Sequence, residues 1–89
     1  MKFEFAKSLS GHDKDQTYLI LRQDGQFAYL ANGTERTVEK PKKKNSKHYQ
    51  VIRHVPDDIL KQLNETSPLT DEIIRRAVRA YDQSISRRQ

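Results

Sequence analysis

The sequence predicts a mainly β fold with C-terminal helices, in which a five-stranded barrel over residues 1–54 precedes a helical extension over residues 55–89. Three observations lead to this prediction. The first half of the chain contains short runs rich in aromatic and β-branched side chains, which favour strands. Asp-Gly and Asn-Gly dipeptides follow two of these runs, and both are strong hairpin signals. Beyond Pro56 the apolar residues recur at steps of three and four, which is typical of helices.

Five strands are predicted along the first half of the chain. In the first, Phe3 and Phe5 alternate with smaller or polar side chains, and a polar loop over residues 10–16 follows. The remaining strands are expected at residues 17–21, 27–31, 34–38 and 48–53. The Asp-Gly at 24–25 and the Asn-Gly at 32–33 favour tight turns with positive φ at both central positions. Short strands joined in this way bury their faces best in a twisted barrel that closes its edges.

Two helices are predicted in the second half. Pro56 is suited to the first position of a short helix over residues 57–63, because proline has no N–H to donate. A longer helix is expected to begin with Ser67 as N-cap and Pro68 as its first residue. Its apolar stripe consists of Leu69, Ile73, Ala77, Ala80, Tyr81 and Ile85. Two pairs of opposite charge, four residues apart, are predicted to interact on it: Asp71–Arg75 and Glu72–Arg76.

The chain is basic, with 17 lysines and arginines against 12 acidic residues among its 89, which gives +5 at pH 7. This surplus fits a nucleic-acid or other anionic partner. The absence of cysteine excludes disulfides and thiolate chemistry. No apolar run approaches membrane-spanning length and no apolar signal segment follows Met1, so we expect a cytoplasmic protein with no membrane partner.

Residues 40–48 form a Lys-rich segment that is predicted to be a loop. It has five lysines in eight positions, no acidic residue, and Pro41, which resists both helix and central strand. Neighbouring ammonium groups repel one another, whereas a polyanion accepts several of them together. The candidate phosphate contacts are Lys40, Lys42, Lys43, Lys44 and Lys47. The alternative interpretation is a solvated linker.

Residues 6–15 carry the pattern Ser8-x-x-Gly11-x-Asp13-Lys14 and precede an apolar run at 18–21. This combination resembles the KOW motif, a strand–loop–strand unit of ribosomal proteins and transcription–translation factors. Further resembling stretches are Asp24-Gly25, Ala31-Asn32-Gly33, Lys40-Pro41-Lys42-Lys43-Lys44-Asn45 with Lys47-His48, and residues 69–77. Taken together, most of the chain resembles the small bacterial KOW-domain RNA-binding proteins that are related to large-subunit ribosomal proteins.

The resemblance implies an SH3-like (KOW-type) barrel that binds RNA. Ribosomal RNA is the expected partner, and ribosomal proteins are further possible ones. The chain departs from the family pattern at Asp15, where Gly is usual, and at Tyr18, near which a second Gly is common. Asp15 places a negative charge in a loop that is expected to approach RNA.

Three further residues are candidate RNA contacts. Lys14 lies in the first loop, whereas His48 and Tyr49 border the Lys-rich segment. The Tyr49 ring has two open alternatives, which are stacking on an unpaired base and packing in the core.

Other conspicuous residues are interpreted as structural. Core packing is favoured for Tyr18, Phe27 and Tyr29, because a domain this small needs most of its aromatic residues inside. Asp13 is expected to cap its own loop by accepting a backbone N–H.

No catalytic, cofactor or metal site is predicted. Residue types of a hydrolase triad occur together within residues 8–13, where neighbouring loop positions cannot supply the required geometry. His48 and His54 lack a third ligand and have cationic neighbours. Two other functions stay open, namely a protein-interaction adaptor that uses the barrel or the long helix, and duplex DNA binding. The oligomeric state is open as well.

Overall fold

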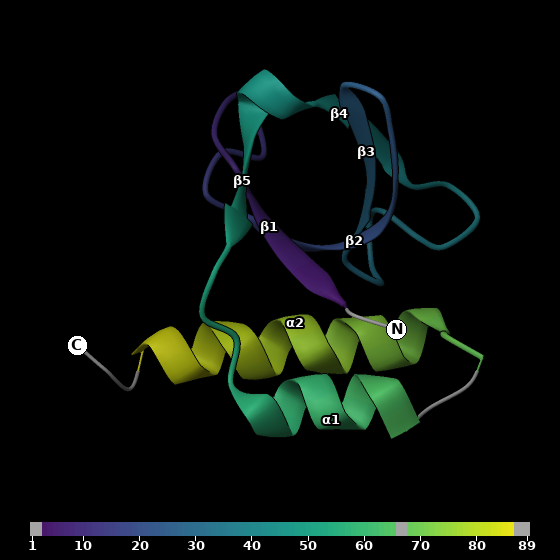
Figure 1. Ribbon diagram of the computed structural model, residues 1–89, viewed down its shortest axis with the longest axis vertical. Coiled ribbons are helices and arrows are strands. Elements are labelled where there is room, and N and C mark those ends of the chain that lie inside the picture. The colour runs from purple at the N-terminus through teal and green to yellow at the C-terminus, as the bar shows by residue number, and fades with distance from the viewer. Residues whose placement is uncertain (1–2, 66–67, 87–89) are drawn as a thin grey trace.

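The computed structural model describes residues 3–65 and 68–86. It consists of a curled five-stranded antiparallel sheet with two helices against one side of it (Figure 1). The strands are β1 (Glu4–Ser8), β2 (Thr17–Asp24), β3 (Phe27–Ala31), β4 (Lys42–Asn45) and β5 (Tyr49–Ile52). The helices are the 3₁₀ turn η1 (Ser46–His48), α1 (Asp57–Glu65) and α2 (Asp71–Ser86). The expected mainly β architecture with C-terminal helices is confirmed.

The strands are ordered β4-β3-β2-β1-β5, so the last strand returns beside the first. The turn η1 joins the two outer strands, β4 and β5 (Figure 1). Within the described residues no pairing between these two strands completes the ring, so the sheet is curled rather than closed by backbone hydrogen bonds. The prediction of a barrel that closes the edges of its sheet is therefore met only in part.

The β2–β3 hairpin occurs where the Asp-Gly dipeptide predicts it. Asp24 pairs with Phe27, which leaves Gly25 and Gln26 as the central residues of the turn. Gly25 has φ +60°, whereas Gln26 is not among the described residues with positive φ. The expectation of positive φ at both central positions is therefore wrong, and the turn has the φ pattern of type II′, with Gly at the first central position.

The predicted strand over residues 34–38 is wrong, because this segment belongs to a loop that connects β3 to β4. The Asn32 side-chain oxygen accepts from the backbone N–H groups of Thr34 and Arg36, at 3.0 and 3.1 Å. Gly33, at φ +81°, lies so close to α2 that a Cβ would be 2.7 Å from the backbone nitrogen of Arg75. The Asn-Gly dipeptide therefore provides a loop that docks on a helix rather than a tight hairpin.

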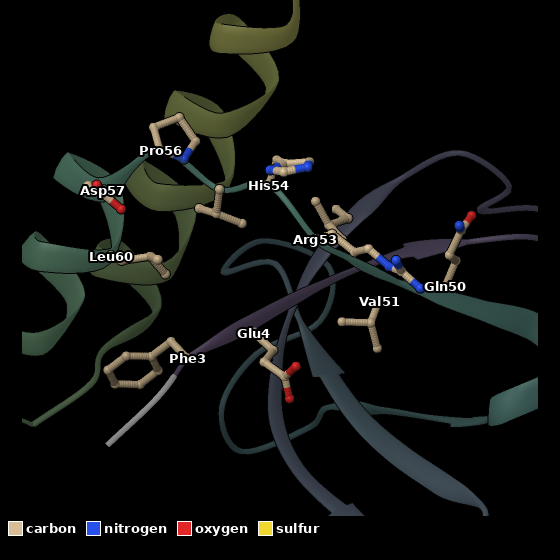
Figure 2. A pocket seen from close by; sticks show the side chains of 11 residues that line it. Phe3, Glu4, Gln50, Val51, Arg53, His54, Pro56, Asp57 and Leu60 are labelled. Carbon is tan, nitrogen blue, oxygen red and sulfur yellow. The ribbon is translucent and has the colours of Figure 1, made fainter.

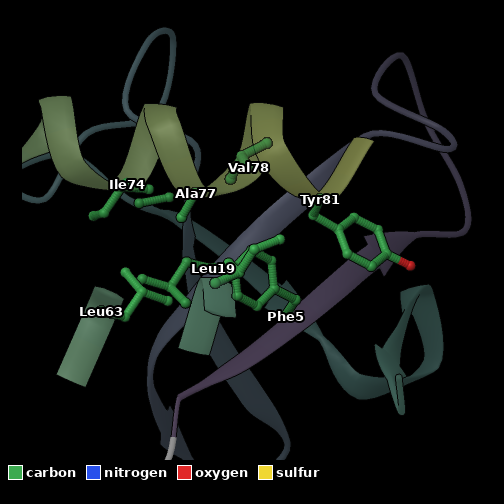
Figure 3. Close-up of a cluster of buried hydrophobic side chains, with 9 residues drawn as sticks. Phe5, Leu19, Leu63, Ile74, Ala77, Val78 and Tyr81 are labelled. Atoms are coloured by element: carbon green, nitrogen blue, oxygen red, sulfur yellow. The ribbon is translucent and has the colours of Figure 1, made fainter. Parts of the chain in front are cut away.

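The sheet separates two hydrophobic clusters. The inner cluster fills the curl and contains Ala6, Tyr18, Ile20, Ala28, Leu30 and Tyr49. The outer cluster lies between the sheet and the helices, where Phe5 and Leu19 face Ile74, Ala77 and Tyr81 of α2 (Figure 3). The centroids of the Phe5 and Tyr81 rings are 5.8 Å apart.

Helix α2 begins later than predicted. Its first turn is capped by Thr70, whose Oγ1 accepts from the backbone N–H of Ile73 at 3.3 Å. Pro68 precedes the helix, and Ser67, the predicted cap, lies outside the described residues. Most of the apolar stripe is covered by the outer cluster, and only Ile85 is exposed, at 39%. Within residues 3–65 and 68–86, neither helix has the length and apolar character needed to cross a membrane.

Candidate nucleic-acid interface

The loop between β1 and β2 places the carboxylate of Asp13 among four side-chain donors. Its Oδ1 atom accepts from Ser8 Oγ and from Lys44 Nζ, both at 3.0 Å. Its Oδ2 atom accepts from Tyr18 OH at 2.7 Å and from Lys42 Nζ at 2.9 Å. We call these five residues the Asp13 cluster. The expectation that Asp13 caps its loop through a backbone N–H is wrong, because side chains supply all these donors.

Lys44 is the most deeply buried cation of the cluster, with 8% of its surface exposed. Its ammonium group donates to Ser8 Oγ at 2.8 Å, to the Ser10 carbonyl at 3.0 Å and to Asp13 Oδ1. An ammonium group has three donors, so each of them has an acceptor here. Full pairing is the condition under which a folded domain tolerates a buried charge.

The titration behaviour of the cluster follows from these contacts. Burial raises the pKa of Asp13, but the hydrogen bonds from Lys42, Tyr18, Lys44 and Ser8 outweigh it and hold that pKa well below its usual range. Burial, the hydrogen bond to Asp13 and the negative charge of Asp13 all raise the pKa of Tyr18. At neutral pH Asp13 is therefore an ionised acceptor and Tyr18 a neutral donor.

The Lys-rich segment is a strand and a 3₁₀ turn over most of its length, so its prediction as a loop is wrong. Lys42 and Lys44 alternate with Lys43, and this alternation points them into the curled sheet, where both reach Asp13. Lys44 is a structural cation and is too buried for a phosphate to reach, which corrects its prediction as a contact. Lys42 is half-buried, and the carboxylate offsets its charge.

The structure distinguishes the candidate aromatic residues that lie in the core from those that do not. Of the two alternatives left open for Tyr49, the structure shows core packing, because its side chain is 8% exposed and belongs to the inner cluster. Tyr18 is buried, as predicted. Phe27 and Tyr29, which were expected in the core, are half-buried and belong to neither cluster.

The other predicted RNA contacts with basic side chains are exposed. Lys14, Lys40, Lys43, Lys47 and His48 all lie at the surface. The β1–β2 loop and η1 meet at one end of the sheet (Figure 1), where the Leu9 N–H donates to the His48 carbonyl at 2.8 Å. This contact brings the segment that carries Lys14 next to the segment that carries Lys47.

Few of the basic side chains are engaged in ion pairs. Among the described residues the pairs are Lys7–Asp15, Lys42–Asp13, Lys44–Asp13 and Arg76–Glu72. The predicted Glu72–Arg76 pair is confirmed, at 2.8 Å. The Asp71–Arg75 pair is wrong, because Asp71 Oδ1 accepts from the Val38 N–H and Arg75 donates to the Gly33 carbonyl.

Asp15, where the chain departs from the KOW pattern, has φ +73°. This left-handed conformation is one that Gly adopts without steric cost and that Asp tolerates better than most residues. Its carboxylate lies 3.6 Å from Lys7 Nζ, with both side chains exposed, so that the pair contributes little stability. Asp15 therefore has the left-handed backbone conformation that Gly would favour at this position.

A groove of about 830 Å³ follows the free edge of β5 and the linker to α1 (Figure 2). Arg53 and His54 line it, but so do Glu4 and Asp57, together with the apolar Phe3 and Leu60. The groove therefore combines acidic and basic side chains. This mixture of charges makes it a poorer site for a polyanion than the surface around β4.

The chain matches no protein-family model and no curated protein with which it was compared.

Proposed function

We propose that this domain is an SH3-like, KOW-type barrel that binds RNA in the cytoplasm, with ribosomal RNA as its partner. Five antiparallel strands in a curled sheet, with β5 returning beside β1, support the fold part of the proposal. The residues resembling the KOW motif form the end of β1, the following loop and the start of β2, which is the strand–loop–strand arrangement expected of that motif.

The observation that carries the proposal is a set of exposed lysines that have no carboxylate partner within the described residues. Lys40, Lys43 and Lys47 occur within eight positions on and around β4, and Lys14 lies in the loop that touches η1. None of the four belongs to the ion pairs described above. Unpaired, neighbouring cations release counterions when they bind phosphates, and this release drives association with RNA.

The Asp13 cluster supports the proposal as a positioning device. Through Lys42 and Lys44 it ties β4 to the β1–β2 loop, and the same strand carries Lys43. A strand held in this way presents its exposed ammonium group in a fixed place, so less conformational entropy is lost on binding. Lysine contacts to phosphate carry no sequence information directly, so recognition is mainly of RNA shape and charge.

The test is a salt series of RNA affinity with the double variant Lys43→Gln and Lys47→Gln. Each lost phosphate contact lowers the slope of log affinity against log salt by about 0.7 to 0.9, so the double variant should lose about 1.4 to 1.8 units of slope. Lys61→Gln with Arg79→Gln is the matched control, because it removes the same charge from exposed positions of α1 and α2. Equal slopes for both double variants would refute the proposal that Lys43 and Lys47 contact RNA phosphates.

Two further measurements separate the related possibilities. Competition between RNA and DNA duplexes of equal length distinguishes RNA binding from duplex DNA binding. Co-sedimentation with ribosomal particles at low salt, and release at high salt, tests the proposed partner. An adaptor function through α2 has less support, because the outer cluster covers most of its apolar stripe.

A further inference from the structure

Two aromatic side chains, Phe27 and Tyr29, lie on the outer side of β3. Their neighbours Ala28 and Leu30 point into the inner cluster, so strand alternation turns these two rings outward. The next outward residue, Ala31, is covered by the helices as part of the outer cluster. The helices therefore cover one part of this face and leave the part with the two rings outside both clusters.

These two rings differ in this respect from every other aromatic residue of the chain. The remaining five all pack in or against one of the two clusters, and they are Phe3, Phe5, Tyr18, Tyr49 and Tyr81. Neither Phe27 nor Tyr29 contributes to a core, although both remain half-buried on the sheet. Core packing therefore does not account for aromatic residues at these two positions.

Each of the two rings has an exposed cation over it. The guanidinium carbon of Arg22 is 4.2 Å from the centroid of the Tyr29 ring, and Lys43 Nζ is 4.4 Å from that of Phe27. The sheet register aligns these residues, since Tyr29 pairs with Arg22 on one side and with Lys43 on the other. We call these four residues the aromatic–cation face.

The charge of this face is complementary to a nucleic-acid backbone. Arg22 and Lys43 have no ion-pair partner among the described residues. Asp24 is the one carboxylate on the outward positions of β2, β3 and β4, and it lies at the hairpin end of β2. Lys40 and Lys47 flank β4 before and after its four residues, which extends the row of cations along the edge strand.

The chemistry of the four residues suits unpaired bases more than a duplex. Cation–π contacts at exposed positions are weak, so a base can replace the Lys43 ammonium on Phe27 while that ammonium moves to a phosphate. A base can also stack on the planar guanidinium of Arg22, which already lies over Tyr29. Base faces are hidden within a duplex, whereas single-stranded RNA presents them.

We propose that the aromatic–cation face is a stacking platform for unpaired bases of single-stranded RNA. The proposal depends on RNA binding as proposed above, and it adds the part of the RNA that is recognised and the residues that recognise it. Stacking on aromatic rings tolerates any base, so this platform selects unpaired RNA rather than a sequence.

The test compares the affinities of a single-stranded RNA of mixed sequence and of a duplex RNA of equal length. Phe27→Leu with Tyr29→Leu keeps apolar side chains on the strand but removes both π-faces. Loss of stacking on both rings should weaken single-strand binding by about 30-fold or more, and the duplex affinity and salt slope should stay unchanged. Phe3→Leu is the matched control, because Phe3 is also half-buried but lies at the groove beside β5.

Two measurements keep the proposal testable if the double variant is destabilised. Tyr29→Phe retains the ring and should bind single-stranded RNA as the natural protein does. In the natural protein, bound single-stranded RNA should shift the NMR signals of the Phe27 and Tyr29 ring protons, because stacked bases exert ring currents.

The outcomes separate the platform from RNA binding in general. A loss for the leucine variant no greater than that of Phe3→Leu, with unmoved ring-proton signals, would overturn the platform and leave salt-dependent RNA binding in place. Absence of any RNA binding by the natural protein at low salt would overturn both proposals.

Discussion

Replacing Asp13 with asparagine removes the one carboxylate that Lys42 and Lys44 share. The asparagine keeps a similar shape but leaves Lys44, which is 8% exposed, without a negative partner. Breaking a buried ion pair by removing one partner costs about 3 to 5 kcal/mol. Small domains have only about 5 to 15 kcal/mol of stability, so we expect Asp13→Asn to lose a large share of it at pH 7.

Urea unfolding at pH 7, followed by circular dichroism, measures this loss. Asp24→Asn is the control, because Asp24 is exposed in the hairpin and has no ion pair among the described residues. This variant should lower the free energy of unfolding by less than about 0.5 kcal/mol. Lys44→Met should cost less than Asp13→Asn, since Asp13 keeps Lys42, Tyr18 and Ser8 as donors. A free-energy loss below about 1 kcal/mol for Asp13→Asn would refute the reasoning.

The stability difference between the natural protein and Asp13→Asn should also depend on pH. The folded-state pKa of Asp13 lies below its ordinary value of 3.8, so the unfolded chain takes up the proton first as the pH falls. The stabilisation by this carboxylate is complete well above pH 3.8 and is lost progressively below it. The stability difference between the natural protein and Asp13→Asn should therefore narrow between about pH 5 and about pH 2. A constant difference across this range would show that the carboxylate does not titrate as its contacts require.

Three further predictions concern the backbone and can be measured by the same urea unfolding. Gly33→Ala should lower the free energy of unfolding by about 2 kcal/mol or more, because a Cβ would press on α2 and φ is +81°. Gly25→Ala is the control and should lower it less, because there is open space around Gly25. Equal losses for the two variants would contradict the close approach of Gly33 to α2. Asp15→Gly should be neutral or stabilising by up to about 1 kcal/mol, because φ is +73°, and a clear loss of stability would contradict this. Thr70→Ala should cost about 1 kcal/mol by removing the cap of α2, whereas Thr70→Ser, which keeps a hydroxyl, should cost much less.

Local pattern was sufficient for much of the fold. Alternation and β-branched residues located β1, β2, β3 and β5 to within a few residues, and the spacing after Pro56 located both helices. These features depend on neighbours close in sequence, which the residues themselves display. The Asp-Gly turn was found for the same reason.

Partners distant in sequence decided the rest. Lys44 contacts Asp13 across 31 positions, so a run of lysines that reads as a solvated loop forms a strand with two of its cations turned inward. Gly33 meets α2, which lies about 40 residues away, and this contact makes a docking loop where the dipeptide indicates a hairpin. The charge pattern predicts the basic segment, but it does not predict which of its ammonium groups remain exposed.

The sequence by itself determined that this chain forms strands followed by helices and concentrates positive charge near its middle. Only the tertiary structure decided that Tyr49 lies inside and that Phe27 and Tyr29 lie outside, beside Arg22 and Lys43. The physical reason is that the direction of a side chain on a strand follows the register and curl of the whole sheet. A shift of one residue reverses both faces, and no local pattern of charge or size specifies that register.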